Sequence, residues 1–264
     1  MILTKNIKEY CQEKKMALRK KLEEMEKSGK RLRLAVIQVG ENEASLRYIR
    51  NKKKDCEEVG IVFEWYHYPE EIATEELIFE IEDLQAHVSG LIVQLPLPEH
   101  IDVERIKRAI NPQKDVDGFH PDTKFKPCTP SGVVRYLEDG CGYSLSGKNV
   151  VIIGRSDIVG KPLAQMMTDR DATVTLCHSK TKNIWQFIEG ADLVVSAVGK
   201  AKFLNCYSIH IPVIDVGINF DESGKLVGDC FNTAGRDVSP VPGGVGLLTR
   251  LALLENVVAA AFGR

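Results

Sequence analysis

Apolar positions in the first 110 residues follow two alternating patterns. In four segments they recur every three or four positions, which predicts helices at residues 6–27, 43–59, 74–84 and 103–110. Between them lie short, nearly continuous apolar runs, typical of buried strands, at residues 34–39, 61–68 and 90–94. Gly29 and Gly60 end two of the helices. Regular alternation of helix and strand predicts a parallel sheet covered by helices.

The second half repeats this alternation after a loop rich in proline and charge. Thr129 is a good N-cap and Pro130 a good first residue for a helix at 132–138. Strands are predicted at residues 149–153, 173–177, 193–198, 212–218 and 226–229, and helices at 184–188 and 248–262. The patterns predict an α/β protein with two α/β domains flanking a cleft. We expect one domain at residues 1–140 with the helix 248–262, and the other at residues 141–247.

A strand, a glycine-bounded loop and a helix start occupy residues 147–167. The strand ends at Gly154, a polar loop follows, and Gly160 and Pro162 open the helix. Unpaired N–H groups and the helix dipole make such a turn a cradle for phosphate. The G-x5-G spacing departs from G-x-G-x-x-G, and an ordinary strand-to-helix turn has the same appearance. The β-α-β-α-β order over residues 149–198 matches half of a Rossmann-type domain, which favours the cradle.

The end of the second strand of this domain bears on the choice of dinucleotide. NAD-binding domains place an Asp or Glu there to hold the adenosine ribose. This chain has His178, Ser179 and Lys180 instead, with Lys182 close behind. A hydroxyl and two lysines, helped by Arg155, suit a 2′-phosphate, so NADP is predicted over NAD. The alternative is a solvated polar loop.

Composition and charge narrow the function classes. A formal net charge of -2 and a pI near 6.3 give no reason to expect nucleic acid or a membrane as a partner. No apolar run is long enough to span a bilayer, and the first residues lack a signal-peptide core. The seven cysteines contain no C-x-x-C pair and are expected to be reduced, which suits the cytoplasm. The six histidines stand singly, so no metal site is predicted.

In the N-terminal half, Tyr48 and Lys52 are spaced to share one face of a helix. Taken alone, the basic stretch around them is a solvated helix face. Gln94, however, ends a buried strand at the carboxyl edge of the sheet, where open α/β sheets bind ligands. Asp115 and Asp117 follow in the next loop. A ring, an ammonium group, an amide and a carboxylate can converge there on a flat heterocycle.

Nine segments, in order along nearly the whole chain, carry a resemblance to one family. They are SLRYIRNKKKDCEEVGI, GLIVQLPLPEH, NPQKDVDGFHP, PCTPSG, GKNVVIIGRSDIVGKP, TVTLCHSKT, ADLVVSAVGK, VIDVGIN and SPVPGGVGLLT. With them the chain resembles the bifunctional methylenetetrahydrofolate dehydrogenase/cyclohydrolase family. The resemblance implies oxidation of 5,10-methylenetetrahydrofolate to the methenyl form with NADP+, then hydrolysis to 10-formyltetrahydrofolate at the same site. It also implies a homodimer joined through the nucleotide domain, in one-carbon metabolism and purine biosynthesis.

The resemblance also implies roles for single residues. Tyr48 packs on the folate rings, Lys52 is the catalytic lysine, Gln94 positions the reacting region, and Asp117 anchors the pterin. The folate site further includes turn residues Leu95, Pro96, Pro242, Gly243 and Gly244. The positions implied for NADP are Gly154, Arg155, Ser156, Ile158, Val159, Gly160, His178, Ser179, Lys180, Val198, Gly199, Gly217 and Ile218.

The expected chemistry suits these residue types. Loss of hydride from a methylene flanked by two nitrogens yields an amidinium-like cation, so this step needs mainly positioning against the nicotinamide. Water attack on the cation needs a proton acceptor, and a lysine serves where burial and a neighbouring cation favour its neutral amine. We expect Lys52 to accept the proton and Gln94 to hold Lys52. Together with Tyr48 they are expected to line one wall of a crevice whose other wall presents the nicotinamide.

Three places depart from the family's pattern. Thr123 stands where an asparagine is usual, in a loop shorter than the family's, and Ala201 replaces a proline near the expected nicotinamide. Leu247 and Leu248 replace Pro-Met, and Leu247 restores a backbone N–H that proline lacks. We expect these changes to affect the balance of the two activities.

Other function classes stay open from the residues alone. A two-domain NADP oxidoreductase of the shikimate- or amino-acid-dehydrogenase type has a similar second domain but lacks YIRNK, VQLPLP and KDVDG together. A non-catalytic nucleotide-binding relative keeps the fold without the chemistry. A nucleic-acid binder using Arg47, Arg50 and the lysines at 52–54 has little support, because one short basic stretch lies on an acidic chain.

Overall fold

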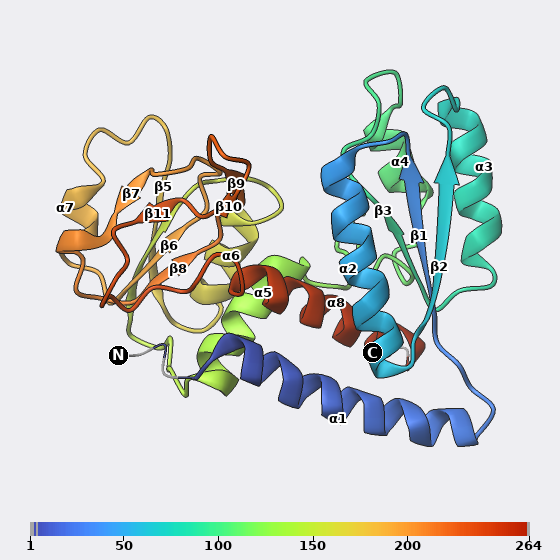
Figure 1. Cartoon of the computed structure of the whole chain (residues 1–264), viewed down its shortest axis with the longest axis horizontal. Coiled ribbons are helices and arrows are strands. Elements are labelled where there is room, and N and C mark those ends of the chain that lie inside the picture. The colour runs from blue at the N-terminus through green and yellow to red at the C-terminus, as the bar shows by residue number, and fades with distance from the viewer. Residues whose placement is uncertain (1–2, 4, 263–264) are drawn as a thin grey trace. The chain divides into compact units, whose positions relative to one another are not determined.

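A computed structural model describes residues 3 and 5–262 of the chain (Figure 1). The described residues form two compact units. The first unit joins those up to Gln12 with Pro127–Thr249, and the second joins Glu13–Lys126 with those from Arg250 onward. The domains expected from the sequence divide the chain at other places, after residues 140 and 247, and those boundaries stay predictions.

Both units contain parallel sheets and helices, which confirms the α/β class. The helices are α1 Ile7–Lys27, α2 Glu43–Val59, α3 Thr74–Gln85, α4 Val103–Ala109, α5 Cys128–Arg135, α6 Gly160–Thr168, α7 Trp185–Ile188 and α8 Val245–Ala261. The strands are β1 Arg33–Val39, β2 Val62–Tyr68, β3 Gly90–Val93, β4 Asn149–Ile153, β5 Thr173–Cys177, β6 Leu193–Ser196, β7 Leu204–Asn205, β8 Val213–Asp215, β9 Asn219–Phe220, β10 Leu226–Val227 and β11 Cys230–Phe231. A π-helical turn, Tyr136–Gly140, follows α5, and a 3-10 turn, Cys206–Ser208, follows β7.

The second unit is built on a parallel sheet with the strand order β2-β1-β3. A further parallel bridge from Leu91 to Asp115 continues this sheet beyond β3. On one face, Ile37 and Leu91 pack against Ile81 of α3 in a buried apolar core. Since successive side chains of a strand point to opposite faces, Gln38 belongs to the other face. Figure 1 shows α2 and α3 on different sides of the strands.

The first unit contains the parallel sheet β5-β4-β6-β8. β5 lies on one side of β4 and β6 on the other, so the chain adds its strands first to one side of β4 and then to the opposite side. Such a reversal is the topological switch point at which open α/β sheets bind nucleotides, outside the carboxyl ends of the strands. The expected β-α-β-α-β order is confirmed, with Val151, Ile153 and Val194 packing against Ile188 of α7.

Three local predictions were wrong. Thr129 does not cap a helix: α5 begins at Cys128, its cap residue Pro127 offers no side-chain hydrogen bond, and the Thr129 hydroxyl pairs with that of Thr249 at 2.9 Å. The strand predicted at 212–218 stops at Asp215, because the chain turns there and β9 pairs with β10 in a separate antiparallel hairpin. The last helix begins at Val245 rather than at residue 248.

Candidate functional site

Lys52 occupies a position on α2 that would normally hold a core side chain. The buried side of this helix carries Ser45, Ile49, Lys52, Cys56 and Val59, spaced three or four apart. Asn42 caps the first turn by accepting the Ser45 N–H, and Gly60 closes the helix with a φ of 91°. Local signals therefore set the helix ends, and the helical repeat places the ammonium group of Lys52 inside, with 3% of the residue exposed.

Two expected partners lie beside this amine. The Nζ atom of Lys52 is 3.1 Å from Oε1 of Gln94 and 4.8 Å from the centre of the Tyr48 ring. The distance to the ring is that of a cation–π contact. The structure thus brings together three of the four residues expected to carry the chemistry, all from α2 and the end of β3.

The turn after β3 fixes the orientation of the Gln94 amide. Its Nε2 donates to the Leu95 carbonyl at 2.9 Å, and the Ser45 hydroxyl donates to the same oxygen at 3.0 Å. With its N–H group engaged there, the amide directs its oxygen towards the donor, Lys52. The peptide bond from Leu95 to Pro96 is cis.

Asp117, the fourth expected residue, is half-buried in the loop that follows the bridge at Asp115. Asp115 itself is 1% exposed, and its Oδ2 accepts the His120 N–H at 2.7 Å. Burial raises the pKa of the Asp115 carboxyl, and hydrogen bonds from this loop oppose that effect. Thr123, at the departure from the family's pattern, donates to the Asp115 carbonyl at 3.2 Å and so closes the loop.

One turn beyond Lys52 lies a buried ion cluster that no sequence pattern indicated. Asp55 is 4% exposed, and its carboxylate lies 2.5 Å from Lys15 Nζ of α1 and 2.6 Å from Arg250 Nε of α8. Burial lowers the pKa of Lys15, but the hydrogen bonds and charges of Asp55 and Glu58 outweigh this and raise it. Burial, with the Asp55 charge, raises the pKa of the Cys56 thiol to about 12. The cluster therefore joins α1, α2 and α8 through the Asp55 carboxylate.

In the first unit, the loop after β4 needs both of its glycines. A Cβ on Gly154, where φ is 121°, would overlap the Ala197 carbonyl oxygen, and one on Gly160 would overlap the Gly154 carbonyl. The close approach of Gly154 to Ala197 joins the carboxyl ends of β4 and β6 at the switch point. Between the glycines, Arg155, Ser156 and Ile158 are exposed and Val159 is half-buried.

The loop after β5 emerges beside it, because β4 and β5 are neighbouring parallel strands. The His178 N–H donates to the Thr181 hydroxyl at 2.9 Å, and the Lys180 N–H donates to His178 Nδ1 at 3.2 Å. These bonds close a tight turn and leave the Ser179 and Lys180 side chains exposed. The groups expected to receive a 2′-phosphate thus lie on two adjacent loops.

The other expected cofactor residues follow β6 and β8 at the same sheet edge. Val198 and Gly199 follow β6 after one intervening residue, and Gly217 and Ile218 follow β8 in the same way. In the turn that opens α8, the N–H that Leu247 supplies donates to the Gly244 carbonyl at 2.9 Å. Gly243 has a φ of 96°, and Pro242 follows a cis peptide bond.

Comparisons with known proteins decide the family. A model described as "Tetrahydrofolate dehydrogenase/cyclohydrolase, catalytic domain" matches residues 4–117, and its companion, "NAD(P)-binding domain", matches residues 127–263. The chain belongs to the tetrahydrofolate dehydrogenase/cyclohydrolase family. It therefore carries both of the family's domains, and the resemblance seen in its motifs is confirmed.

Members of the family match over almost their whole length. The bifunctional protein FolD of Bacillus pumilus is 43% identical over 271 residues, covering 96% of this chain and 95% of the relative. The crystal structure of the bifunctional FolD of Campylobacter jejuni has a TM-score of 0.93 at 41% identity and covers 98% of both chains. FolD of Trypanosoma brucei, complexed with NADP and an inhibitor, has a TM-score of 0.91 at 32% identity, covering 98% and 96%. Among the described residues of this family member, no helix combines the length and apolar character needed to cross a membrane.

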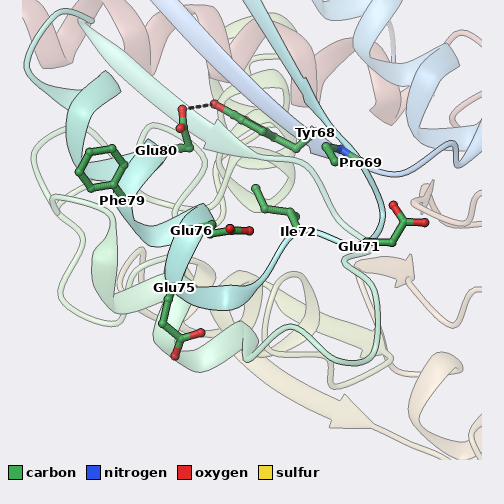
Figure 2. Close-up of a pocket in the computed structure, with 8 residues that line it drawn as sticks. All are labelled: Tyr68, Pro69, Glu71, Ile72, Glu75, Glu76, Phe79 and Glu80. Carbon is green, nitrogen blue, oxygen red and sulfur yellow. Dashed lines mark hydrogen bonds between the residues drawn. The ribbon is translucent and has the colours of Figure 1, made fainter.

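A hollow of about 690 Å³ beside α3 includes none of the residues expected from the family resemblance (Figure 2). Its lining includes four glutamates and the ring of Phe79, which is 69% exposed. Glu80 accepts the Tyr68 hydroxyl at 2.7 Å, and Glu75 pairs with Arg105 at 2.6 Å. Because Glu75 and Glu80 already bind neighbouring side chains, we assign the hollow no chemistry.

Proposed function

We propose that this chain oxidises 5,10-methylenetetrahydrofolate to the 5,10-methenyl form with NADP+ and hydrolyses the product to 10-formyltetrahydrofolate in one shared site. The observation that carries the proposal is the buried amine of Lys52, held by Gln94 beside the Tyr48 ring, in a member of the dehydrogenase/cyclohydrolase family. The domain at residues 1–140 with 248–262 binds the folate, and residues 141–247 bind NADP.

The oxidation step needs little acid–base help from the protein. NADP+, when bound, would supply the hydride acceptor, and the two nitrogens beside the reacting carbon would stabilise the cation that remains. The Tyr48 ring packs on the folate, Asp117 anchors the pterin, and the turn residues Leu95 and Pro96 border it. The other turn contributes Pro242, Gly243 and Gly244. Their common task is positioning, which accounts for a large share of the barrier in such reactions.

The hydrolysis step uses Lys52 as the proton acceptor. A water oxygen bonds to the methenyl carbon and passes its proton to the neutral amine of Lys52. The bond from that carbon to N5 then breaks while the remaining hydroxyl proton leaves to water, and Lys52 returns its proton to N5, which leaves the formyl group on N10. Gln94 accepts a hydrogen bond from Lys52 at 3.1 Å and keeps the amine aimed while its charge changes.

The preference for NADP rests on the two adjacent loops after β4 and β5. Arg155, Ser179 and Lys180 are exposed there, and no carboxylate stands where an NAD-binding domain needs one. Charge-assisted hydrogen bonds from arginine and lysine favour a 2′-phosphate. The T. brucei relative is solved with NADP. The Gly154–Gly160 turn and the residues Val198, Gly199, Gly217 and Ile218 complete the proposed cofactor site.

On the family's pattern we further propose a cytoplasmic homodimer joined through the nucleotide domain. Light scattering of the purified chain distinguishes a dimer from a monomer. A monomer at micromolar concentration would contradict the proposed assembly without touching the proposed chemistry.

The test of function follows two signals from the purified chain. With methylenetetrahydrofolate and NADP+ we expect NADPH and methenyl absorbance to rise together, and added methenyltetrahydrofolate to decay faster than in buffer. Neither signal, with NADP binding intact, would favour a non-catalytic relative. Turnover of shikimate or an amino acid in place of the folate would favour the rival oxidoreductase.

A further inference from the structure

Two buried aspartates stand behind the carboxyl edge of the nucleotide-binding sheet. Asp215 ends β8 and is 3% exposed, and Asp229 precedes β11 and is 0% exposed. Within the described residues neither carboxylate pairs with a cation; N–H and O–H donors surround both instead. A buried carboxylate without a counter-ion is tolerated only where such donors compensate its charge.

Asp229 collects donors from the loops after β6 and β8. Its Oδ2 accepts hydrogen bonds from the Ser196 hydroxyl at 3.1 Å and from the N–H groups of Val198 at 2.7 Å and Gly199 at 3.3 Å. Its Oδ1 accepts hydrogen bonds from the Lys200 N–H at 2.9 Å and from the Asn219 side-chain amide at 3.0 Å. One side chain therefore holds two loops together.

Asp215 holds Asp229 in turn. Its Oδ1 accepts the N–H groups of Gly217 and Asp229, each at 3.0 Å, and its Oδ2 accepts that of Cys230 at 2.9 Å. Two glycines make room for the pair. A Cβ on Gly217 would overlap the Asp229 carboxylate, and a Cβ on Gly228 would overlap that of Asp215.

We propose that Asp229, oriented by Asp215, is a positioning residue for the dinucleotide. In a trans peptide the C=O group points away from the N–H group of the same plane. With the N–H groups of Gly199 and Lys200 turned inward to Asp229, the carbonyl oxygens of Val198 and Gly199 turn outward. This loop then presents acceptors for hydroxyl and amide donors of the dinucleotide and leaves phosphate binding to the Gly154–Gly160 turn. The inference rests on the proposed function.

The decisive variant is Asp229→Asn. It keeps the shape of the side chain, but the amide NH2 group cannot accept hydrogen bonds from the N–H donors that the carboxylate oxygen accepted. We expect the Kd of NADPH, measured by fluorescence titration, and the KM of NADP+ to rise about tenfold or more. Methenyl hydrolysis, assayed without dinucleotide, is expected to stay within about twofold, because Asp229 and the proposed hydrolytic residue Lys52 belong to different units. Asp192→Asn is the matched control: this half-exposed carboxylate accepts the Asn149 N–H at 2.8 Å, at the opposite end of the strands, and its loss should leave both constants unchanged.

A milder variant covers the case in which Asp229→Asn does not fold. Ser196→Ala removes one of five donors and keeps the charge, so a rise in Kd of about threefold to tenfold is expected. Unchanged dinucleotide affinity in Ser196→Ala and in folded Asp229→Asn would overturn the inference, as would an equal loss of hydrolysis and dinucleotide binding. A wild-type chain that binds NADPH but catalyses neither step would instead refute the proposed function, while the affinity comparison would still decide the role of Asp229.

Discussion

The amine of the buried Lys52 and the amide oxygen of the half-buried Gln94 lie 3.1 Å apart, although one comes from a helix and the other from the end of a strand. The amide can accept a hydrogen bond from either the charged or the neutral form of the amine. It therefore holds the lysine in place without opposing the loss of its proton, which a carboxylate partner would do. This difference makes the pair testable.

Lys52→Met should separate the two proposed activities. The methionine keeps the apolar stem but cannot accept a proton, so methenyl hydrolysis is expected to fall about 10²- to 10⁴-fold, while some dehydrogenase activity remains. Lys53→Met, at an exposed position of the same helix, is the control and should change neither rate. Equal loss of both activities, with folate and NADP binding intact, would contradict the assignment of Lys52 to hydrolysis.

Gln94→Glu tests the role of the neutral partner. A carboxylate beside the amine stabilises the ammonium form, so hydrolysis should slow about tenfold or more near neutral pH and recover partly as the pH rises. The pH–rate profile of hydrolysis measures this shift, and Gln113→Glu, in an exposed loop, serves as the control. An unchanged pH profile would show that Gln94 does not govern the protonation of Lys52.

Arg155→Ala should weaken the preference for NADP. Loss of one charge-assisted contact to the 2′-phosphate is expected to raise the KM of NADP+ about tenfold and to leave the KM of NAD+ nearly unchanged. Steady-state kinetics with both dinucleotides measure the ratio. Lys225→Ala, between β9 and β10, removes an exposed charge elsewhere in this unit and should have no effect. A parallel rise for both dinucleotides would point to a general role in binding instead.

Asp55→Ala should destabilise the unit that carries Lys52. The substitution leaves Lys15 and Arg250, whose side chains are 12% and 16% exposed, without their shared carboxylate. Removing one partner of a buried ion pair typically costs about 3–5 kcal/mol. Urea unfolding measures the loss, with Asp83→Ala on the exposed side of α3 as the control. A change similar to that of the control would show that the cluster contributes little.

The stability contributed by Asp115 should depend on pH in a predictable direction. Burial raises its pKa above the ordinary 3.8, so the folded protein binds this proton more tightly than the unfolded chain does. Ionisation then lowers the free energy of unfolding as pH rises from about 3.8 to the raised value, by at most about 1.4 kcal/mol per pH unit.

Asp115→Asn removes that titration. The free energy of unfolding of the wild type relative to this variant is expected to fall through the window above pH 3.8 and to level off beyond it. Urea unfolding of both proteins between pH 4 and 7 measures the difference, from which contributions common to both, including that of Asp215, cancel. A difference that is constant with pH would contradict the raised pKa.

Most helices and strands could be predicted because their signals are local. The period of α2, its Asn42 cap and its end at Gly60 lie within one short segment, and so does the apolar run of β4. Where a residue from a distant part of the chain binds the same side chain, the prediction from the local signal was wrong. Thr129 has the chemistry of a cap, yet its hydroxyl bonds to Thr249, which enters from the far end of the chain.

The sequence by itself determined the α/β class, the order of its elements, the family and the short list containing Tyr48, Lys52 and Gln94. Spacing and residue type are enough for these. Only the tertiary structure decided that Lys52 meets Gln94, that Asp55 lies between Lys15 and Arg250, and that Asp229 gathers two loops. Such contacts depend on strand order, sheet face and helix packing, which join residues far apart in the chain and leave no mark at any one position.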